Sequence, residues 1–275
     1  MIWLGLIVVM AALWFSNRYA WWRSPIDWRH PRVLMYHMVS PHRPGAKFNG
    51  LRVTPERFEA QLAWLQREGW QFFTLSELWE QWDNLPEKSV AITFDDGYAD
   101  NLHNALPLLE KYDARATIYM VVDRHDRDWS TAKKAHHDSG ELAREPKLSD
   151  DDLQRLVASG RIEIGSHTLT HINMRTTPAA EKRRELTESR RLLQAQTGQA
   201  VTSFAYPFGI YGEEDVALAR EAGYVSAVTT RHGVVKAAHR DHLHALPRIS
   251  LNGLYQKARY VQALASGIPS RLKKG

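Results

Sequence analysis

The stretch SVAITFDDGYAD, from Ser89 to Asp100, decides the fold. Its first six residues form an apolar run typical of a buried strand, and the run ends in the adjacent carboxylates Asp95 and Asp96 and a glycine. Parallel α/β folds keep their chemistry at the carboxyl ends of such strands. Two adjacent carboxylates repel each other, so a cation or a proton is needed to hold them together at neutral pH. The stretch therefore predicts a parallel α/β fold with a metal-binding carboxylate at a strand end.

Two histidines follow a second strand-like run, at residues 162–166. They are His167 and His171 in the sequence HTLTH, and on a helical turn this spacing would place both rings on one face. With one of the two aspartates they would form a site of two nitrogens and one oxygen, with a position left open for water, as in catalytic zinc centres. Taken alone, the aspartate pair is more typical of a turn or helix cap, and the histidine pair of a solvated helix. Their joint occurrence at two strand ends favours the metal site.

These two motifs resemble, residue for residue, those of the polysaccharide deacetylases, also called the NodB-homology or carbohydrate esterase family 4 group. The resemblance extends to FAYPFG at residues 204–209 and LPRI at 246–249, and it covers roughly residues 32–250. The Leu-x-His motif that ends the ordinary family order is missing from the C-terminal part. A strand-like run ending in His37 resembles instead the circularly permuted deacetylases that act on poly-N-acetylglucosamine, as do KFNGL at 47–51 and TPERF at 54–58.

The resemblance implies a role for each acidic and basic residue of the motifs. Asp96, His167 and His171 would hold a divalent metal, zinc first, although cobalt, nickel, iron or manganese would also suit this ligand set. Asp95 would remain unligated and act as the general base on water. The arginine that often precedes the FAYPFG motif in the family is absent here. Arg248 is expected to supply that charge, pair with Asp95 and keep it ionised.

The remaining roles fall on His37 and on the turn Tyr206, Pro207 and Phe208. His37 would protonate the departing amine, although a strand-end histidine bonded to backbone is the alternative. A backbone N–H near Tyr206 would stabilise the oxyanion, and Phe208 would be a platform for the sugar. The expected activity is a metal-dependent N-deacetylation of N-acetylhexosamine in an envelope glycan, either poly-N-acetylglucosamine or a lipid-linked or lipopolysaccharide precursor.

Two other classes of function stay open. One is a non-catalytic glycan-binding relative, which the intact set of motif residues disfavours. The other is a metal hydrolase acting on a different acyl group or on phosphate. The chain has no glycine-rich phosphate loop, no HExxH and no GxSxG motif, which disfavours this class.

Strand-like and helical segments alternate about seven times, which predicts a distorted (β/α)7-type barrel with parallel strands. Helix starts are expected at Pro55 and Pro178, and a helix stop at Gly198. The polar segment 123–147, with three histidines, is expected to be a mobile loop over the site rather than a second metal centre. The strands are expected at residues 33–37, 71–75, 90–94, 116–121, 162–166, 201–206, 225–229 and 244–249.

Composition suits one catalytic domain, predicted for residues 32–270, between a linker at 23–31 and a basic tail at 271–275. The chain has 275 residues, of which 44% are hydrophobic and 24% charged, so it can bury a large core. No cysteine occurs, which excludes disulfides and thiolate metal sites. The net charge is +5, but the basic residues are scattered and no nucleic-acid module is present, which indicates a membrane neighbour rather than nucleic acid. Nothing in the sequence indicates an oligomeric state.

The first 22 residues are expected to form a transmembrane anchor or an uncleaved signal in the inner membrane. Residues 2–15 carry no charge and are followed by aromatic and basic residues. A cleaved signal peptide is disfavoured because no Lys or Arg precedes the apolar run. The apolar core is short against the ~20 residues of a spanning helix, so the span would have to include residues 16–22 with Arg18 reaching the interface. The basic residues after the segment slightly favour a cytoplasmic catalytic domain, whereas the permuted relatives mostly work outside the cytoplasm.

Overall fold

The computed structural model describes residues 2–19, 26–133, 139–251 and 264. Its centre is a closed ring of seven parallel strands. The ring closes because β1 (Arg32–Tyr36) pairs in parallel with both β10 (Leu246–Ser250) and β5 (Ser89–Asp95). The other members are β6 (Ala116–Met120), β7 (Ile162–Ser166), β8 (Ser203–Ala205) and β9 (Ser226–His232). The predicted seven-stranded parallel barrel is confirmed.

Three further strands lie outside this ring. The strand β4 (Gln71–Phe73) pairs with residues 89–91 at the start of β5. It lies on the same edge of β5 as β6, which pairs with residues 92–95. The short strands β2 (Met38–Val39) and β3 (Arg52–Val53) form a separate parallel pair beside the carboxyl end of β1. The sequence did not predict β2 and β3, because a strand of two residues carries no period.

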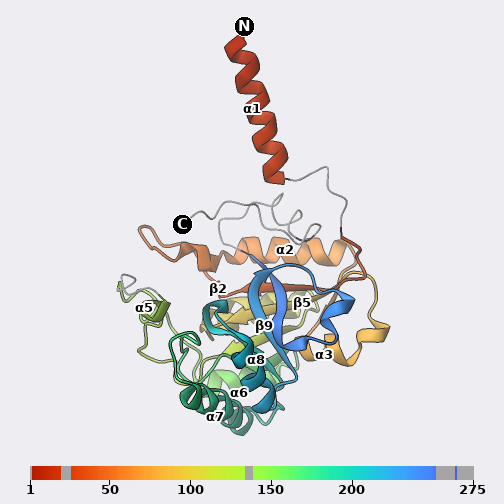
Figure 1. Ribbon diagram of the computed structural model, residues 1–275. Coiled ribbons are helices and arrows are strands. Elements are labelled where there is room, and N and C mark those ends of the chain that lie inside the picture. Colours follow the sequence, from red (N-terminus) through yellow and green to blue (C-terminus); the bar gives the residue numbers. More distant parts are fainter. Residues whose placement is uncertain (1, 20–25, 134–138, 252–263, 265–275) are drawn as a thin grey trace.

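Apart from α1 (Ile2–Tyr19), which extends away from the strands, the helices lie around them (Figure 1). The expected start at Pro55 is confirmed, and Gly198 ends α7 in the left-handed conformation with φ 69°. Pro178 lies just before the first residue of α7 rather than within it. The helices are α1 (Ile2–Tyr19), α2 (Pro55–Arg67), α3 (Leu75–Glu80), α4 (Leu106–Lys111), α5 (Ser130–Lys133), α6 (Asp150–Ala158), α7 (Ala179–Thr197) and α8 (Glu213–Glu221).

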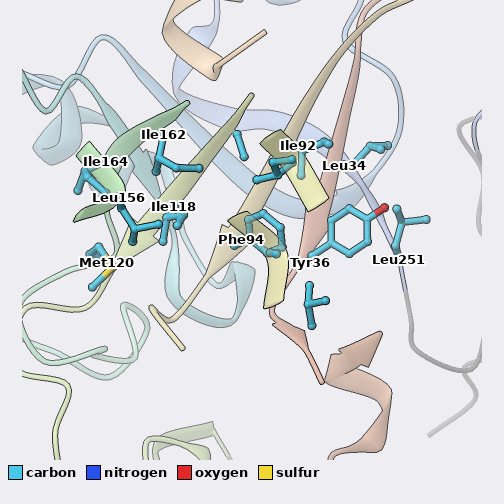
Figure 2. Close-up of a cluster of buried hydrophobic side chains, with 14 of the residues drawn as sticks. Leu34, Tyr36, Ile92, Phe94, Ile118, Met120, Leu156, Ile162, Ile164 and Leu251 are labelled. Atoms are coloured by element: carbon cyan, nitrogen blue, oxygen red, sulfur yellow. The ribbon is translucent and has the colours of Figure 1, made fainter. Parts of the chain in front are cut away.

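Alternation along the strands separates two apolar layers. One set of side chains packs against the helices and forms the main core, part of which Figure 2 shows. It includes Leu34, Tyr36, Ile92, Phe94, Ile118, Met120, Ile162 and Ile164. The alternate positions, such as Val33, Ala91 and Tyr119, form a second cluster inside the ring. Thr93 and Asp95 share the register of Ala91, so the sequence pattern that buries Ile92 and Phe94 also turns Asp95 toward the barrel interior.

The N-terminal segment forms the expected helix, α1. Within the parts of the chain that the structure describes, however, no helix is both long and apolar enough to cross a membrane. The transmembrane anchor predicted for residues 1–22 is therefore unsupported. Residues 23–25 of the predicted linker and the basic tail 271–275 lie outside the described residues.

Candidate active site

Two adjacent aspartates, Asp95 and Asp96, lie at the carboxyl end of β5. Asp95 is the last residue of the strand, whereas Asp96 has φ 79° and Gly97 has φ 72°, so the chain turns sharply between them. A side chain at position 97 would bring its Cβ to 2.7 Å from the Met120 methyl carbon. The backbone conformation therefore favours glycine, and a larger residue would also require the end of the Met120 side chain to move. The turn sends Asp95 and Asp96 into different surroundings.

Asp95 binds Arg248, which reaches it from β10. The Arg248 Nη1 and Nη2 atoms each donate to one Asp95 carboxylate oxygen at 2.7 Å, and both side chains are buried. Arg248 also donates to Thr93 Oγ1 at 3.0 Å and to the Thr229 carbonyl at 2.9 Å, so its guanidinium is well fixed. Burial acts to raise the pKa of Asp95, but the charge and hydrogen bonds of Arg248 outweigh it and hold this pKa below its usual value. Asp95 is thus an ionised carboxylate in the barrel interior.

Asp96 lies between two imidazoles. Its Oδ1 atom is 3.4 Å from His167 Nε2 and 3.3 Å from His171 Nε2, and all three residues are buried. Burial acts to raise the pKa of Asp96, but the two histidines hold it well below its usual value. The pKa of His171 is lowered, mainly by burial, which favours its neutral form.

The atoms that face each other in this cluster suit a cation. His167 Nδ1 donates to the Ala205 carbonyl at 2.7 Å, so Nδ1 carries a ring proton. His167 Nε2 faces the Asp96 carboxylate, so these two atoms need a proton or a cation between them. A divalent cation bound between them would satisfy both groups, and the donor set of two imidazoles and one carboxylate suits zinc.

A loop, not the expected helical turn, brings the two histidines together. His167 follows β7 directly, and the chain then turns through Thr168 at φ 70° and His171 at φ 59°. The buried carboxylate of Glu185 on α7 accepts hydrogen bonds from the N–H groups of Leu169 and Thr170, at 2.8 and 2.9 Å, and from the Thr170 hydroxyl at 2.7 Å. A loop held in place by hydrogen bonds to Glu185 therefore brings together the two histidines, which are four residues apart. The sequence did not predict this role of Glu185.

Asp96, His167 and His171 line a cavity of about 440 Å³ at the mouth of the barrel. His37, which follows β1, is half-buried and lines the same cavity as Asp96, His167 and His171. The polar segment predicted to cover the site does so, since Trp129, Ser130, Lys133 and Leu142 are part of the lining. His136 and His137 of this segment lie outside the described residues, and its expected mobility stays a prediction. Within the described residues, Asp96, His167 and His171 form the one cluster suited to a metal.

The turn after β8 narrows the predicted oxyanion donor near Tyr206 to one N–H group. The Tyr206 hydroxyl donates to the His244 carbonyl at 3.0 Å, away from the cavity, and the Tyr206 N–H donates to the Val228 carbonyl at 3.2 Å. Pro207 has no N–H, so the Phe208 N–H is the donor that this turn can offer to an oxyanion. Phe208 lines the cavity, with φ 59°. The next residue is Gly209. A Cβ at this position would lie 1.9 Å from Thr230 Oγ1, so a larger residue would not fit.

The apolar walls of the cavity were also missed from the sequence. Phe48 and Leu51 come from the segment before β3, and Trp129 and Leu142 from the segment after β6. Arg52 links these two segments, because it donates to Glu141 at 2.9 Å and to Glu145 at 2.6 Å. Its side chain is fully buried. A tryptophan within an otherwise polar stretch was the available signal for Trp129.

Comparison with known proteins agrees with this geometry. The family model described as "Polysaccharide deacetylase" matches residues 83–227. The protein YxkH of Bacillus subtilis (strain 168), named for the same family, is 34% identical over 224 residues, which cover 80% of this chain and 71% of that protein. Poly-beta-1,6-N-acetyl-D-glucosamine N-deacetylase of Staphylococcus aureus (strain MRSA252) is 23% identical over 73% of this chain and 68% of that protein.

A solved structure shares both the fold and part of the sequence. The Streptococcus pyogenes deacetylase PplD, solved in complex with acetate, superimposes with a TM-score of 0.70 at 25% identity, covering 88% of this chain and all of that chain. The family match includes Asp95, Asp96, His167 and His171, which the barrel gathers at one end. The chain therefore belongs to the polysaccharide deacetylase family, whose members are hydrolases acting on amide C–N bonds.

Proposed function

We propose that this protein is a metal-dependent N-deacetylase that hydrolyses the acetamide of N-acetylhexosamine residues in a cell-envelope glycan. The observation that carries the proposal is the pair of adjacent, differently held carboxylates at the carboxyl end of β5, of which Asp96 lines the cavity. Asp95 is paired with Arg248, and Asp96 lies between His167 and His171. Amide hydrolysis needs both a base and a centre that polarises the carbonyl, and the two carboxylates supply one function each.

The metal half of the site is formed by Asp96, His167 and His171. A divalent metal held there would lower the pKa of a water molecule and polarise the acetyl carbonyl. The three side chains would orient that chemistry toward the cavity, since His167 is fixed by Ala205 and the loop carrying His171 is braced by Glu185. The chemistry of the ligands suits zinc, with cobalt, nickel, iron or manganese as alternatives.

Asp95 is the base in this proposal. Its carboxylate stays ionised because Arg248 compensates its burial, so it can take a proton from water. The Phe208 N–H is assigned to the oxyanion that forms from the acetyl carbonyl, as the N–H near Tyr206 that is free to donate to it. His37, on the same cavity, would protonate the amine as the C–N bond breaks.

The glycan is assigned by class. The similarity to an enzyme named for poly-beta-1,6-N-acetyl-D-glucosamine supports a polymer of N-acetylglucosamine as the first substrate to test. A lipid-linked or lipopolysaccharide precursor is the second. A location at the inner membrane stays a prediction from the sequence, and fractionation of cells that express the full chain would test it.

The test is acetate release from N-acetylglucosamine oligomers by the full-length chain, after chelation and again with zinc restored. We expect acetate release that depends on the metal and is lost in Asp95→Asn. Bound zinc with no acetate would exclude this substrate and direct the test to lipid-linked acceptors. Phosphate release from a sugar phosphate, with no acetate from any N-acetylated glycan, would reject the proposal.

A further inference from the structure

The two histidines of the metal cluster are held in different ways. Metal-binding histidines usually donate their second ring N–H to a carboxylate, carbonyl or water, which fixes the ring. His167 follows this rule through Ala205. His171 does not, because its buried Nδ1 atom has no hydrogen-bond partner among the described residues. Some other contact must orient the His171 ring.

Two aromatic rings contact His171. The Trp129 ring stacks on it at a centroid distance of 4.9 Å with 23° between the planes, and the Phe208 ring meets it edge-on at 4.5 Å. Each such contact is directional, because aromatic quadrupoles favour offset stacks and edge-to-face pairs. Trp129 is only 5% exposed, so its ring is confined by packing as well.

Trp129 is held in turn by a buried cation. The Lys147 Nζ atom lies 4.8 Å from the Trp129 ring centroid and 4.8 Å from that of Tyr98. The same ammonium donates to the carbonyls of Leu142 at 2.6 Å and Glu145 at 2.9 Å. Lys147 therefore links the Trp129 ring to the carbonyls of Leu142 and Glu145 in the same segment.

We propose that Trp129, fixed by Lys147, is a positioning residue for His171 and replaces the hydrogen bond that this ligand lacks. The inference rests on the proposed metal site. It assigns to the covering segment a role in metal binding, in addition to the wall that it contributes to the substrate cavity. Phe208 restrains the same ring from a second direction.

Zinc affinity of the full-length chain, measured by competition with a chromogenic chelator, tests this assignment together with the visible spectrum of the cobalt(II) form. We expect Trp129→Leu to weaken zinc binding by about 10- to 100-fold, the range usual for lost support of a ligand. The cobalt spectrum should also change, because the orientation of one nitrogen ligand changes. Trp129→Phe keeps an aromatic ring and should bind zinc within about threefold of the wild type.

Trp70→Leu is the matched control. Trp70 is 4% exposed and, like Trp129, contacts both a second aromatic ring and a cation, Trp28 and Arg32, but it does not line the cavity. Its variant should bind zinc like the wild type. Lys147→Met, which retains Trp129, should weaken zinc binding by about threefold or more and provides a second reading if Trp129→Leu does not fold.

Wild-type zinc affinity and an unchanged cobalt spectrum in Trp129→Leu would overturn the inference, even if the KM for glycan rises, since Trp129 would then only line the cavity. That result would leave the proposed function intact. A wild-type protein that binds neither zinc nor cobalt would instead reject the metal site itself, and this inference with it.

Discussion

The site has two halves that differ in how they hold a buried carboxylate. The proposed base half, Asp95 with Arg248, lies in the barrel interior and is closed by two hydrogen bonds of 2.7 Å. The proposed metal half, Asp96 with His167 and His171, lies at the mouth, where Asp96 faces two imidazole nitrogens at 3.3 and 3.4 Å instead of an arginine. Both carboxyl pKa values are lowered, by a permanent cation in one half and by imidazoles in the other. Adjacent residues of the same type thus acquire different chemistry from their partners alone.

Removing Asp96 should have the largest effect. Asp96→Ala deletes the oxygen ligand, so we expect zinc binding to be lost. Without the metal, acetate release should fall by about 10⁴-fold or more, where each tenfold corresponds to about 1.4 kcal/mol of lost transition-state stabilisation. Metal content after dialysis and steady-state acetate release measure the two effects. A variant that keeps one bound zinc and near-normal activity would show that the metal half is wrongly assigned.

Asp95→Asn should separate the halves. It keeps the size of the side chain but removes the base, so we expect activity to fall by about 10²- to 10⁴-fold while zinc binding is retained. Zinc titration and acetate release on one preparation give both values. If zinc binding and activity were lost together, Asp95 would belong to the metal half, and the contrast drawn above would fail.

The alternation of strand-like and helical segments predicted the barrel, and the strand-end positions of the two aspartates and the two histidines predicted that they meet. The separate roles of Asp95 and Asp96 and the pairing of Arg248 with Asp95 were expectations from the resemblance to the family. The Asp96-Gly97 turn and the two histidines lie where parallel strands bring their ends together. The sequence could not predict that Thr168 and His171 adopt positive φ values, or that Glu185 braces their loop, because such contacts join residues far apart in the chain. The sequence could place the oxyanion donor only near Tyr206, because the bond of the Tyr206 N–H to Val228, which leaves Phe208 as the donor, depends on the register between β8 and β9.

Arg248→Met should weaken the base half in a second way. It leaves Asp95 buried without its cation, so we expect the free energy of unfolding at pH 7 to fall by about 3 to 5 kcal/mol. Burial would then raise the pKa of Asp95, and the acidic limb of the pH–activity profile should move to higher pH, because the base must be ionised. Arg248→Lys keeps a positive charge but cannot donate two parallel hydrogen bonds to Asp95. Its stability and its acidic limb should therefore lie between those of the wild type and those of Arg248→Met. Urea unfolding gives the stability, and an acidic limb that does not move would contradict the assigned base.

A third carboxylate of the same stretch, Asp100, gives the smallest expected effect and shows what burial does where opposing interactions do not outweigh it. Burial raises the pKa of Asp100 from 3.8 to about 6, and nearby Glu145 adds to the rise, against the hydrogen bonds from Val39 and Ser40 and the charge of Arg52. Since the folded chain binds this proton more tightly than the unfolded chain, Asp100 should cost stability progressively as pH rises from about 4 to 6, and the cost should stay constant above that. Asp100→Asn removes the titration. We therefore expect the stability of the wild type relative to this variant to fall by about 1 to 3 kcal/mol between pH 4 and pH 7. Urea unfolding of both proteins across this range measures the difference. Parallel stability curves would mean that Asp100, like Asp95 and Asp96, has a compensating positive partner, and that the three carboxylates do not differ in the way argued here.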